Sequence, residues 1–429
     1  MTATLKRLLS SAAFIVVIAL ALRLAILWWT WHRAAPAPPN VPYGYELGCV
    51  AKSIASGQGF SSPLPFFDTG PTAWLSPVFP YIVAGIFKIW GIYSVKSHIA
   101  IQILNCIFSA LAIFPVYAIA KRSFGARVAV GASWLWVVLP DATHVPIADL
   151  WEASFAALFL ALLFWATLAM RGERSIAKWA GYGALWAVGA LINTSLIAVL
   201  PFFLAWLAWE ARKERTPWLR PVAVASLVFV LGMAPWTVRN HEALGKFVPV
   251  RSNFGLEFWL GNNPQALDVN AFELHPFVDR SEAEEYRSMG EIAYMHEKQR
   301  AALAFIRANP GTTAYFILRR IGSYWFAVSD RVGSVLSNGS LYLKGYFFFD
   351  AAMTLLAWFG AAIAWRTRNL YRAPYLFVLF AYPLVFYVTH ALVRYRFPME
   401  PILAVLSVAG ASYVCGLCPI APEVPGLIT

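Results

Sequence analysis

Apolar runs long enough to cross a lipid bilayer recur along the whole chain, and they restrict the possible folds more than any other feature. The hydrocarbon core of a bilayer is about 30 Å thick, which about 20 apolar residues span as a helix. The composition, 59% hydrophobic and 13% charged, excludes an ordinary soluble protein. We therefore expect an all-α polytopic membrane protein with about ten transmembrane helices, at 11–31, 98–120, 128–143, 147–170, 179–193, 194–209, 221–238, 343–365, 373–389 and 397–417.

The charged residues indicate how these spans are oriented. Lys and Arg number 34 against 22 Asp and Glu, a formal net charge of +12. Cytoplasmic loops of membrane proteins carry such an excess of Lys and Arg. We therefore interpret the charge as a topology signal and expect no nucleic-acid partner. Four basic clusters are placed in the cytoplasm, at 121–127, 171–178, 212–220 and 366–372.

The apolar segment 76–93 is ambiguous, because counting it as a span would move all four basic clusters to the outside. It carries Pro77 and Pro80 at its start and Lys88 within it, and its length of about 18 residues is the lower limit for a span. We therefore predict that it lies along the outer membrane interface. This topology leaves two large outer loops, 32–97 and 239–342.

The second outer loop is predicted to fold as a small cap. Residues 239–312 carry eight Lys and Arg against ten Asp and Glu, without the basic bias of a cytoplasmic loop. Ser281 with Glu284 has the spacing of a capping box that begins a helix. The sequence shows no internal repeat, so residues 1–429 are expected to form a single membrane domain.

Four acidic residues on the predicted outer face are candidates for catalysis. Glu46 begins an amphipathic helix that is predicted to lie on the membrane, where a charge favoured by the helix dipole is the alternative explanation. Asp141 lies in a short outer loop. Asp149 and Glu152 follow, three residues apart and hence on one helical face. Acidic groups at membrane depth usually face a polar cavity, although these two could also simply cap and solvate a helix start.

Arginines on the outer face are candidates for binding an anion. Arg394 and Arg396 lie outside in the predicted topology, against the usual bias. The guanidinium group is a planar fork of donors that suits phosphate, whereas the alternative is an anchor to lipid head groups. Arg239 and Arg251 are further candidates.

Carboxylates and arginines gathered above a membrane favour group transfer from a lipid phosphate. A phosphate ester has a second pKa of about 6 and leaves without a general acid. The site then needs a carboxylate to take the proton of the acceptor and cations to hold the departing charge. Glu46 fits the first role, and Arg394 and Arg396 fit the second.

At these residues the chain resembles the bacterial GT-C glycosyltransferases related to protein O-mannosyltransferases and to the lipid A aminoarabinose transferase. The resemblance covers nearly the whole chain and rests on segments 43–46, 55–61, 71–74, 235–240, 253–262 and 394–398, each of which is loose alone. It implies a GT-C-like fold with interfacial helices in the first outer loop. It also implies an inverting glycosyltransferase that moves a hexosyl or pentosyl group from a polyprenyl-phosphate donor to a lipid, glycan or protein acceptor. The location implied is the bacterial inner membrane, with the site facing the periplasm.

The resemblance assigns the catalytic base to an acidic residue in the first outer loop, which Glu46 matches. Many relatives carry two adjacent acidic residues there, whereas Glu46 stands between Tyr45 and Leu47. The second acidic residue is therefore Asp141, Asp149 or Glu152, and the need for a divalent cation stays open. A polyprenyl-lipid binding or transport protein without catalysis is the alternative function.

Overall fold

The computed structural model describes residues 7–33, 42–148, 150–266, 271–326 and 341–416, and the regular secondary structure in this part of the chain is helical, apart from one isolated antiparallel bridge between Ser61 and Pro71. The membrane part contains α2 (Ala12–Arg33), α5 (Val95–Leu111), α6 (Ile113–Phe124), α7 (Ala126–Val138), α8 (Pro140–Ala148), α9 (Ala153–Met170), α10 (Ile176–Ile192), η1 (Thr194–Val199), α11 (Leu200–Lys213), α12 (Leu219–Leu244), α18 (Leu341–Arg366), α19 (Arg372–Ala381), α20 (Leu384–Val388), α21 (Val393–Arg396), η3 (Phe397–Met399) and α22 (Glu400–Val414). The outer part contains α3 (Tyr45–Ala55), α4 (Val78–Trp90), α13 (Phe254–Gly261), η2 (Ala271–Leu274), α14 (Arg280–Met289), α15 (Glu291–Ala308) and α16 (Pro310–Phe326).

The all-α membrane fold predicted from the sequence is confirmed. Seven helices in the described residues are long and apolar enough to cross a membrane, and the pair α7 and α8, which bends by 42°, makes eight if it is counted as one span. Two further predicted spans correspond to the shorter apolar helices at Ile176–Ile192 and Arg372–Val388. The count of about ten therefore stays a prediction.

Glycines allow the transmembrane helices to pack closely. A Cβ atom on Gly360 of α18 would lie 2.1 Å from the carbonyl oxygen of Leu406 in α22, and one on Gly183 of α10 would lie 2.2 Å from that of Ala225 in α12. Neither position accepts a larger residue without the helices moving apart. Small residues at such contacts are typical of membrane helices, because close packing replaces the hydrophobic driving force that lipid removes.

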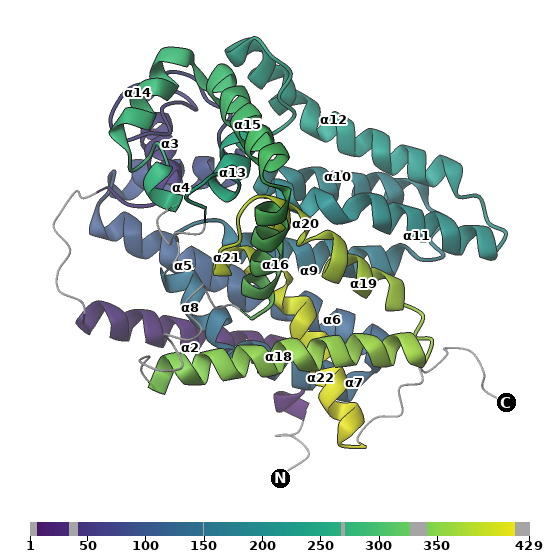
Figure 1. Cartoon of the computed structure of the whole chain (residues 1–429). Helices are drawn as coiled ribbons and strands as arrows, with labels where there is room; N and C mark the ends of the chain where they lie inside the picture. The colour runs from purple at the N-terminus through teal and green to yellow at the C-terminus, as the bar shows by residue number, and fades with distance from the viewer. Residues whose placement is uncertain (1–6, 34–41, 149, 267–270, 327–340, 417–429) are drawn as a thin grey trace, which may run out of the picture.

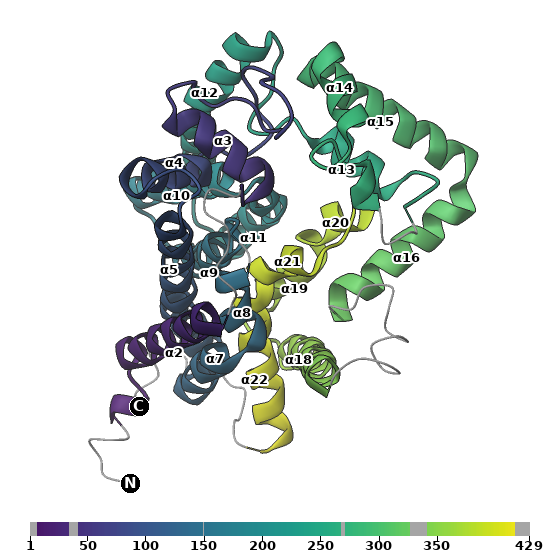
Figure 2. The same cartoon turned by 90° about the vertical axis from the view of Figure 1, so that its left-hand side faces the viewer.

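The two large loops meet at one end of the molecule. Figure 1 shows α3, α4, α13 and α14 gathered at the upper left, and they stay at the top in Figure 2. One apolar cluster joins them, with Leu47, Trp74 and Phe79 from the first loop and Tyr286 and Tyr294 from the second. The sequence-based topology likewise places both loops on one side of the membrane.

Helix α4 covers most of the ambiguous segment 76–93. Its 13 residues rise about 20 Å, which is short of the bilayer core. This length agrees with an interfacial position. The predicted capping box at Ser281 is wrong, because α14 begins one residue earlier and Asp279 is its N-cap, accepting a hydrogen bond from the backbone N–H of Ser281.

Candidate active site

A cavity of about 660 Å³ opens between the outer helices and the ends of the membrane helices. Four of the residues proposed from the sequence line it: Glu46, Glu152, Arg251 and Arg394. They come from segments up to 348 positions apart, since 394 − 46 = 348. The fold therefore brings carboxylates and arginines from both outer loops and the last membrane segment to one cavity.

Glu46 lies in the first turn of α3, and the chain turns sharply at Gly44, just before the helix begins. Gly44 has φ +81°, a left-handed conformation that glycine adopts without a steric penalty. Gly48 permits the chain to pass, because a Cβ atom there would lie 1.9 Å from the carbonyl oxygen of Tyr43. The Glu46 side chain is only 6% exposed. Burial raises the pKa of Glu46 to about 7, even though Arg394 and Arg251 act in the opposite direction.

His275 faces Glu46 across the cavity, a pairing that the sequence analysis missed. Its Nε2 atom lies 3.3 Å from Oε1 of Glu46. The Nδ1 atom accepts a hydrogen bond from the backbone N–H of Phe277 at 3.1 Å. Burial lowers the pKa of His275 to about 4, so the imidazole is neutral at pH 7. With Nδ1 accepting, the proton of the neutral ring resides on Nε2, which directs an N–H group at the carboxylate.

A second carboxylate and imidazole lie in the same cavity. Oε2 of Glu257 is 3.3 Å from Nδ1 of His390, and Oε1 of Glu257 accepts a hydrogen bond from Asn253 at 2.6 Å. Burial lowers the pKa of His390. Glu257 lies within segment 253–262, one of the segments behind the resemblance, but neither residue was among the predicted site residues, because their proximity to Glu46 arises from tertiary folding.

Glu46, Glu257 and His390 are the residues of this cavity that could hold a metal, since both ring nitrogens of His275 already have partners. Carboxylate oxygens with an imidazole nitrogen form a donor set that suits Zn²⁺ and other first-row divalent ions. By donor type these residues suit such an ion, and they line the same cavity as Arg251 and Arg394.

Arg251 and Arg394 give the cavity its positive side. Nε of Arg251 donates to the carbonyl oxygen of Trp74 at 3.0 Å, which fixes the guanidinium beside the first outer loop. The guanidinium of Arg394 lies 4.8 Å from the ring centroid of Trp151 and 5.5 Å from that of Tyr395. A guanidinium group can stack on aromatic faces and also bind phosphate through its planar fork of donors.

Glu152 also lines the cavity, at the N-cap position of α9. It accepts a hydrogen bond from Asn193 at 3.2 Å, and the side-chain oxygen of Asn193 accepts one from the backbone N–H of Ser195. The turn between the predicted spans 179–193 and 194–209 is thus hydrogen-bonded to the cavity wall through Asn193.

Arg239 does not line the cavity. It donates to the carbonyl oxygens of Phe60 and Thr72 at 2.6 and 2.5 Å, and its guanidinium lies 4.9 Å from the ring centroid of Trp236. Its hydrogen bonds hold the turn of the first outer loop, so the structure gives it a positioning role in place of the predicted phosphate contact.

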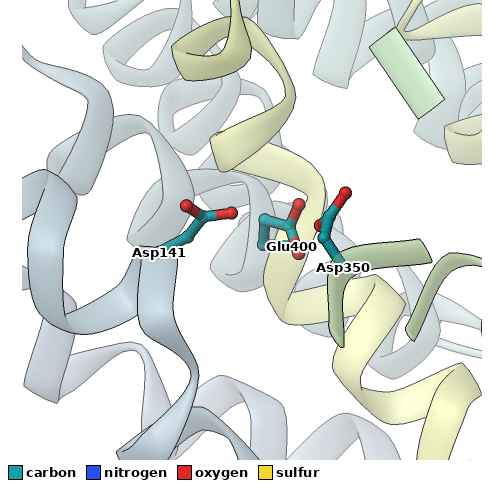
Figure 3. A group of neighbouring side chains, drawn as sticks. All are labelled: Asp141, Asp350 and Glu400. Carbon is teal, nitrogen blue, oxygen red and sulfur yellow. The ribbon is translucent and has the colours of Figure 1, made fainter. Parts of the chain in front are cut away.

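Arg396 and Asp141 do not line the cavity but belong to a separate buried cluster, whose carboxylates Asp141, Asp350 and Glu400 are drawn in Figure 3. Arg396 forms a bidentate ion pair with Asp350 at 2.7 and 2.8 Å, and its Nε atom is 2.6 Å from Glu400. Asp141 accepts a hydrogen bond from Tyr346. With its side chain 1% exposed and these partners in place, Arg396 does not reach a ligand in the cavity. Asp149 lies outside the described residues.

Comparison with known proteins identifies the fold. A profile of the family described as dolichyl-phosphate-mannose-protein mannosyltransferase matches residues 73–236, less than half of the chain. A search of curated proteins finds no match.

Solved structures match over a greater length. The archaeal oligosaccharyltransferase AglB from Archaeoglobus fulgidus, in complex with an inhibitory peptide and a dolichol-phosphate, is similar with a TM-score of 0.58 and 16% identity. The match covers 94% of this chain and 50% of AglB, so the chain spans about half the length of that protein. AglB in complex with Zn and sulfate matches with a TM-score of 0.54 and 16% identity, over 94% of this chain and 49% of AglB. ArnT from Cupriavidus metallidurans in the apo state matches with a TM-score of 0.39 and 16% identity, over 93% of this chain and 78% of ArnT.

The AglB structures show that this multi-pass membrane protein shares the fold of AglB, and the family profile matches part of the same chain.

Proposed function

We propose that the protein is an inverting glycosyltransferase that moves a sugar from a polyprenyl-phosphate donor to an acceptor hydroxyl at the outer face of the membrane. The observation that carries the proposal is the convergence of Glu46, Arg251 and Arg394 on one cavity. AglB, which shares the fold, has been solved with a dolichol-phosphate. The membrane proposed is a bacterial inner membrane, with the cavity facing the periplasm.

Glu46 is the proposed general base. A carboxylate with a pKa of about 7 is a stronger base than an exposed one, and at neutral pH a large fraction of it is still ionised. It takes the proton of the acceptor hydroxyl while that oxygen attacks the anomeric carbon. The N–H group of His275 orients the carboxylate and hydrogen-bonds to its charged form. Single displacement at the anomeric carbon inverts its configuration.

Arg251 and Arg394 are the proposed contacts to the donor phosphate. As the bond from the anomeric carbon to the phosphate oxygen breaks, the phosphate leaves with the electron pair and gains negative charge. Two fixed guanidinium groups stabilise this charge most in a cavity that excludes water. Apolar side chains extend the lining toward the membrane helices and suit a prenyl chain: Ala198, Val385, Phe386 and Leu392.

A divalent cation, when bound, would act as a Lewis acid that neutralises the departing phosphate. Glu257 and His390 are the residues that would hold it beside Glu46. AglB has been solved with Zn and sulfate, and the donor set of this cavity is compatible with such an ion.

The test compares Glu46→Gln with Glu152→Gln, a second acidic residue of the same cavity, in purified protein in nanodiscs. Mass spectrometry of co-purified lipids first identifies the polyprenyl-phosphate sugar, and transfer from that lipid is then measured. We expect Glu46→Gln to lower turnover about 100-fold or more while it still binds the donor, and Glu152→Gln to keep most of the activity. If the wild type binds the lipid without transferring its sugar, the protein is a lipid binder or transporter. Normal turnover in Glu46→Gln would move the base to Glu152 or Glu257.

A further inference from the structure

Behind the wall of the cavity, three buried carboxylates converge from different membrane helices. Asp141 comes from α8, Asp350 from α18 and Glu400 from α22, and Figure 3 shows Glu400 between the other two. One carboxylate oxygen from each lies within 4.8 Å of the others. The three residues are 8%, 4% and 1% exposed. Pro398, two residues before Glu400, lines the cavity, and so does Tyr395, next to Arg396, so the cluster lies behind the proposed active site.

The charges of this cluster do not balance. Among the described residues, the positive charge in this cluster comes from Arg396, which pairs with both Asp350 and Glu400. Three ionised carboxylates and one guanidinium sum to −3 + 1 = −2. An uncompensated charge of this size is very costly in a low-dielectric interior, so the excess must be neutralised, either by a bound cation or by protons on the carboxylates.

Unsatisfied polar atoms show where that charge is missing. Oε2 of Glu400 is buried and has no hydrogen-bond partner within the described part of the chain. Nε of Arg396 is 2.6 Å from Oε1 of Glu400, but the contact lacks hydrogen-bond alignment, and that Nε is likewise unsatisfied. Both oxygens of Asp350 already accept from the Arg396 fork. Buried polar atoms are nearly always satisfied in native proteins, so an orphaned carboxylate oxygen inside an acidic cluster indicates a ligand.

We propose that Asp141, Asp350 and Glu400 bind one divalent cation. Its two charges cancel the excess of −2, and one ion reaches all three residues because their oxygens lie within 4.8 Å. The donors are oxygens only, which favours a hard ion such as Mn²⁺, Mg²⁺ or Ca²⁺ and separates this site from the mixed nitrogen and oxygen donors of the cavity. The ion ties α8, α18 and α22 together and fixes Arg396, two residues from Arg394. This site does not depend on the proposed transfer reaction.

The test uses Mn²⁺ as the probe and the full-length protein in nanodiscs. The cavity also contains metal-type donors, so the background is a variant with Glu46→Gln, His275→Ala and His390→Ala. Electron paramagnetic resonance should show this background binding one Mn²⁺ per chain. Removal of divalent ions with a chelator should lower its thermal unfolding midpoint by several degrees, and Mn²⁺ or Ca²⁺ should restore it.

Asp141→Asn and Glu400→Gln each remove one charge with little change of shape. We expect either to weaken Mn²⁺ binding at least tenfold and to make the unfolding midpoint insensitive to the chelator. If a variant fails to fold, Mn²⁺ binding and the effect of the chelator, measured on the background protein and the wild type, still test the proposal. If the folded background binds no Mn²⁺ and ignores the chelator, the proposal is overturned, and the carboxylates are neutralised by protons instead.

Discussion

The Nε2 atom of His275 lies 3.3 Å from Oε1 of Glu46, while its Nδ1 atom accepts the backbone N–H of Phe277. The second contact determines the effect of the first. A neutral imidazole whose Nδ1 accepts a hydrogen bond carries its proton on Nε2, so His275 presents a donor to Glu46. The pair therefore holds a carboxylate whose pKa is raised by burial, next to a group that favours its charged form.

Activity should rise with pH in a single step near pH 7. Burial raises the pKa of Glu46 to about 7, and the base acts only when it is deprotonated. At pH 5.5 most of Glu46 is protonated and inactive, and above pH 8 it is ionised. The pH profile of kcat/KM checks this. A rise centred near pH 4.5 would show that the base is an exposed carboxylate and not Glu46.

Replacing His275 with Ala should move that step to higher pH. The N–H group of His275 hydrogen-bonds to the ionised form of Glu46, and its loss raises the pKa of the carboxylate further. The same pH profile, measured on the variant, should show a displaced midpoint, with donor affinity changed less than kcat. A lower turnover with an unmoved midpoint would indicate that His275 acts on something other than the base.

Arg394 and Arg396 should behave differently although they are two residues apart. Arg394→Lys keeps the charge but loses the planar fork, and Ala should cost about 1.5–3 kcal/mol of donor binding for each charged hydrogen bond lost. Arg396→Ala should instead unfold the protein more easily, because it leaves Asp350 and Glu400 buried without their cation, at a cost of about 3–5 kcal/mol.

Donor binding by lipid titration and thermal unfolding, measured on both variants, separate the two roles. If Lys replaces Arg394 with no loss of donor affinity, the residue is an anchor for lipid head groups, which depends mainly on charge. A stable Arg396→Ala protein with weak donor binding would return Arg396 to the phosphate site.

The contrast between Arg394 and Arg396 shows how far the sequence could lead. Apolar run length and the positive-inside bias identified the membrane fold and an exceptional basic pair. Arg396 pairs with Glu400, four residues later, and also with Asp350, 46 residues earlier on α18, to which no local pattern connects it. Arg239 was also a candidate because it lies on the predicted outer face. In the structure its N–H groups donate to the carbonyl oxygens of Phe60 and Thr72, which no local pattern predicts.

The residues found only in the structure share one property. His275, Glu257 and His390 lie in or next to irregular or short elements, where helical periodicity does not distinguish a cavity residue from a surface one; Glu257 belongs to segment 253–262, which did not single it out. Glu46 could be found because it begins a helix in an outer loop and belongs to a short motif. The predicted capping box failed because Asp279, two residues before Ser281, is an equally good N-cap.

Glu291 should be important for stability without touching the cavity. Its buried carboxylate accepts hydrogen bonds from the backbone N–H of Ala73 at 2.8 Å, from Ser252 at 2.6 Å and from Tyr286 at 2.7 Å, and also from Thr72. Glu291→Gln replaces one acceptor oxygen by a donor, so at least one partner loses its bond, at a cost of about 1–3 kcal/mol.

The matched control for Glu291 is Glu284→Gln, which removes an exposed ion pair with Arg280 and should cost about 0–1 kcal/mol. Thermal unfolding in detergent compares the two. Equal midpoints would show that the two outer loops do not depend on the Glu291 carboxylate for their association.

The orientation of the chain can be tested with single cysteines. The four native cysteines are replaced by serine, and new ones are placed at exposed positions: Gln58 and Ser288 in the outer loops, and Lys121 and Thr367 in the basic clusters. Exposed positions are needed because a buried cysteine fails to react on either side of the membrane. In intact cells we expect an impermeant thiol reagent to modify 58 and 288 but not 121 and 367, and all four to react once the membrane is permeabilised.

The labelling result also decides whether α4 crosses the membrane or lies along its interface. If α4 lies along the interface, an even number of crossings separates 58 from 288 and an odd number separates 58 from 121, as the positive-inside bias requires. Labelling of 121 from outside together with 58 would mean that the basic clusters face the periplasm, against that bias. Both outer loops pack on one apolar cluster, so 58 and 288 must react alike in either orientation. A chain in which only one of those two reacts would contradict the fold itself.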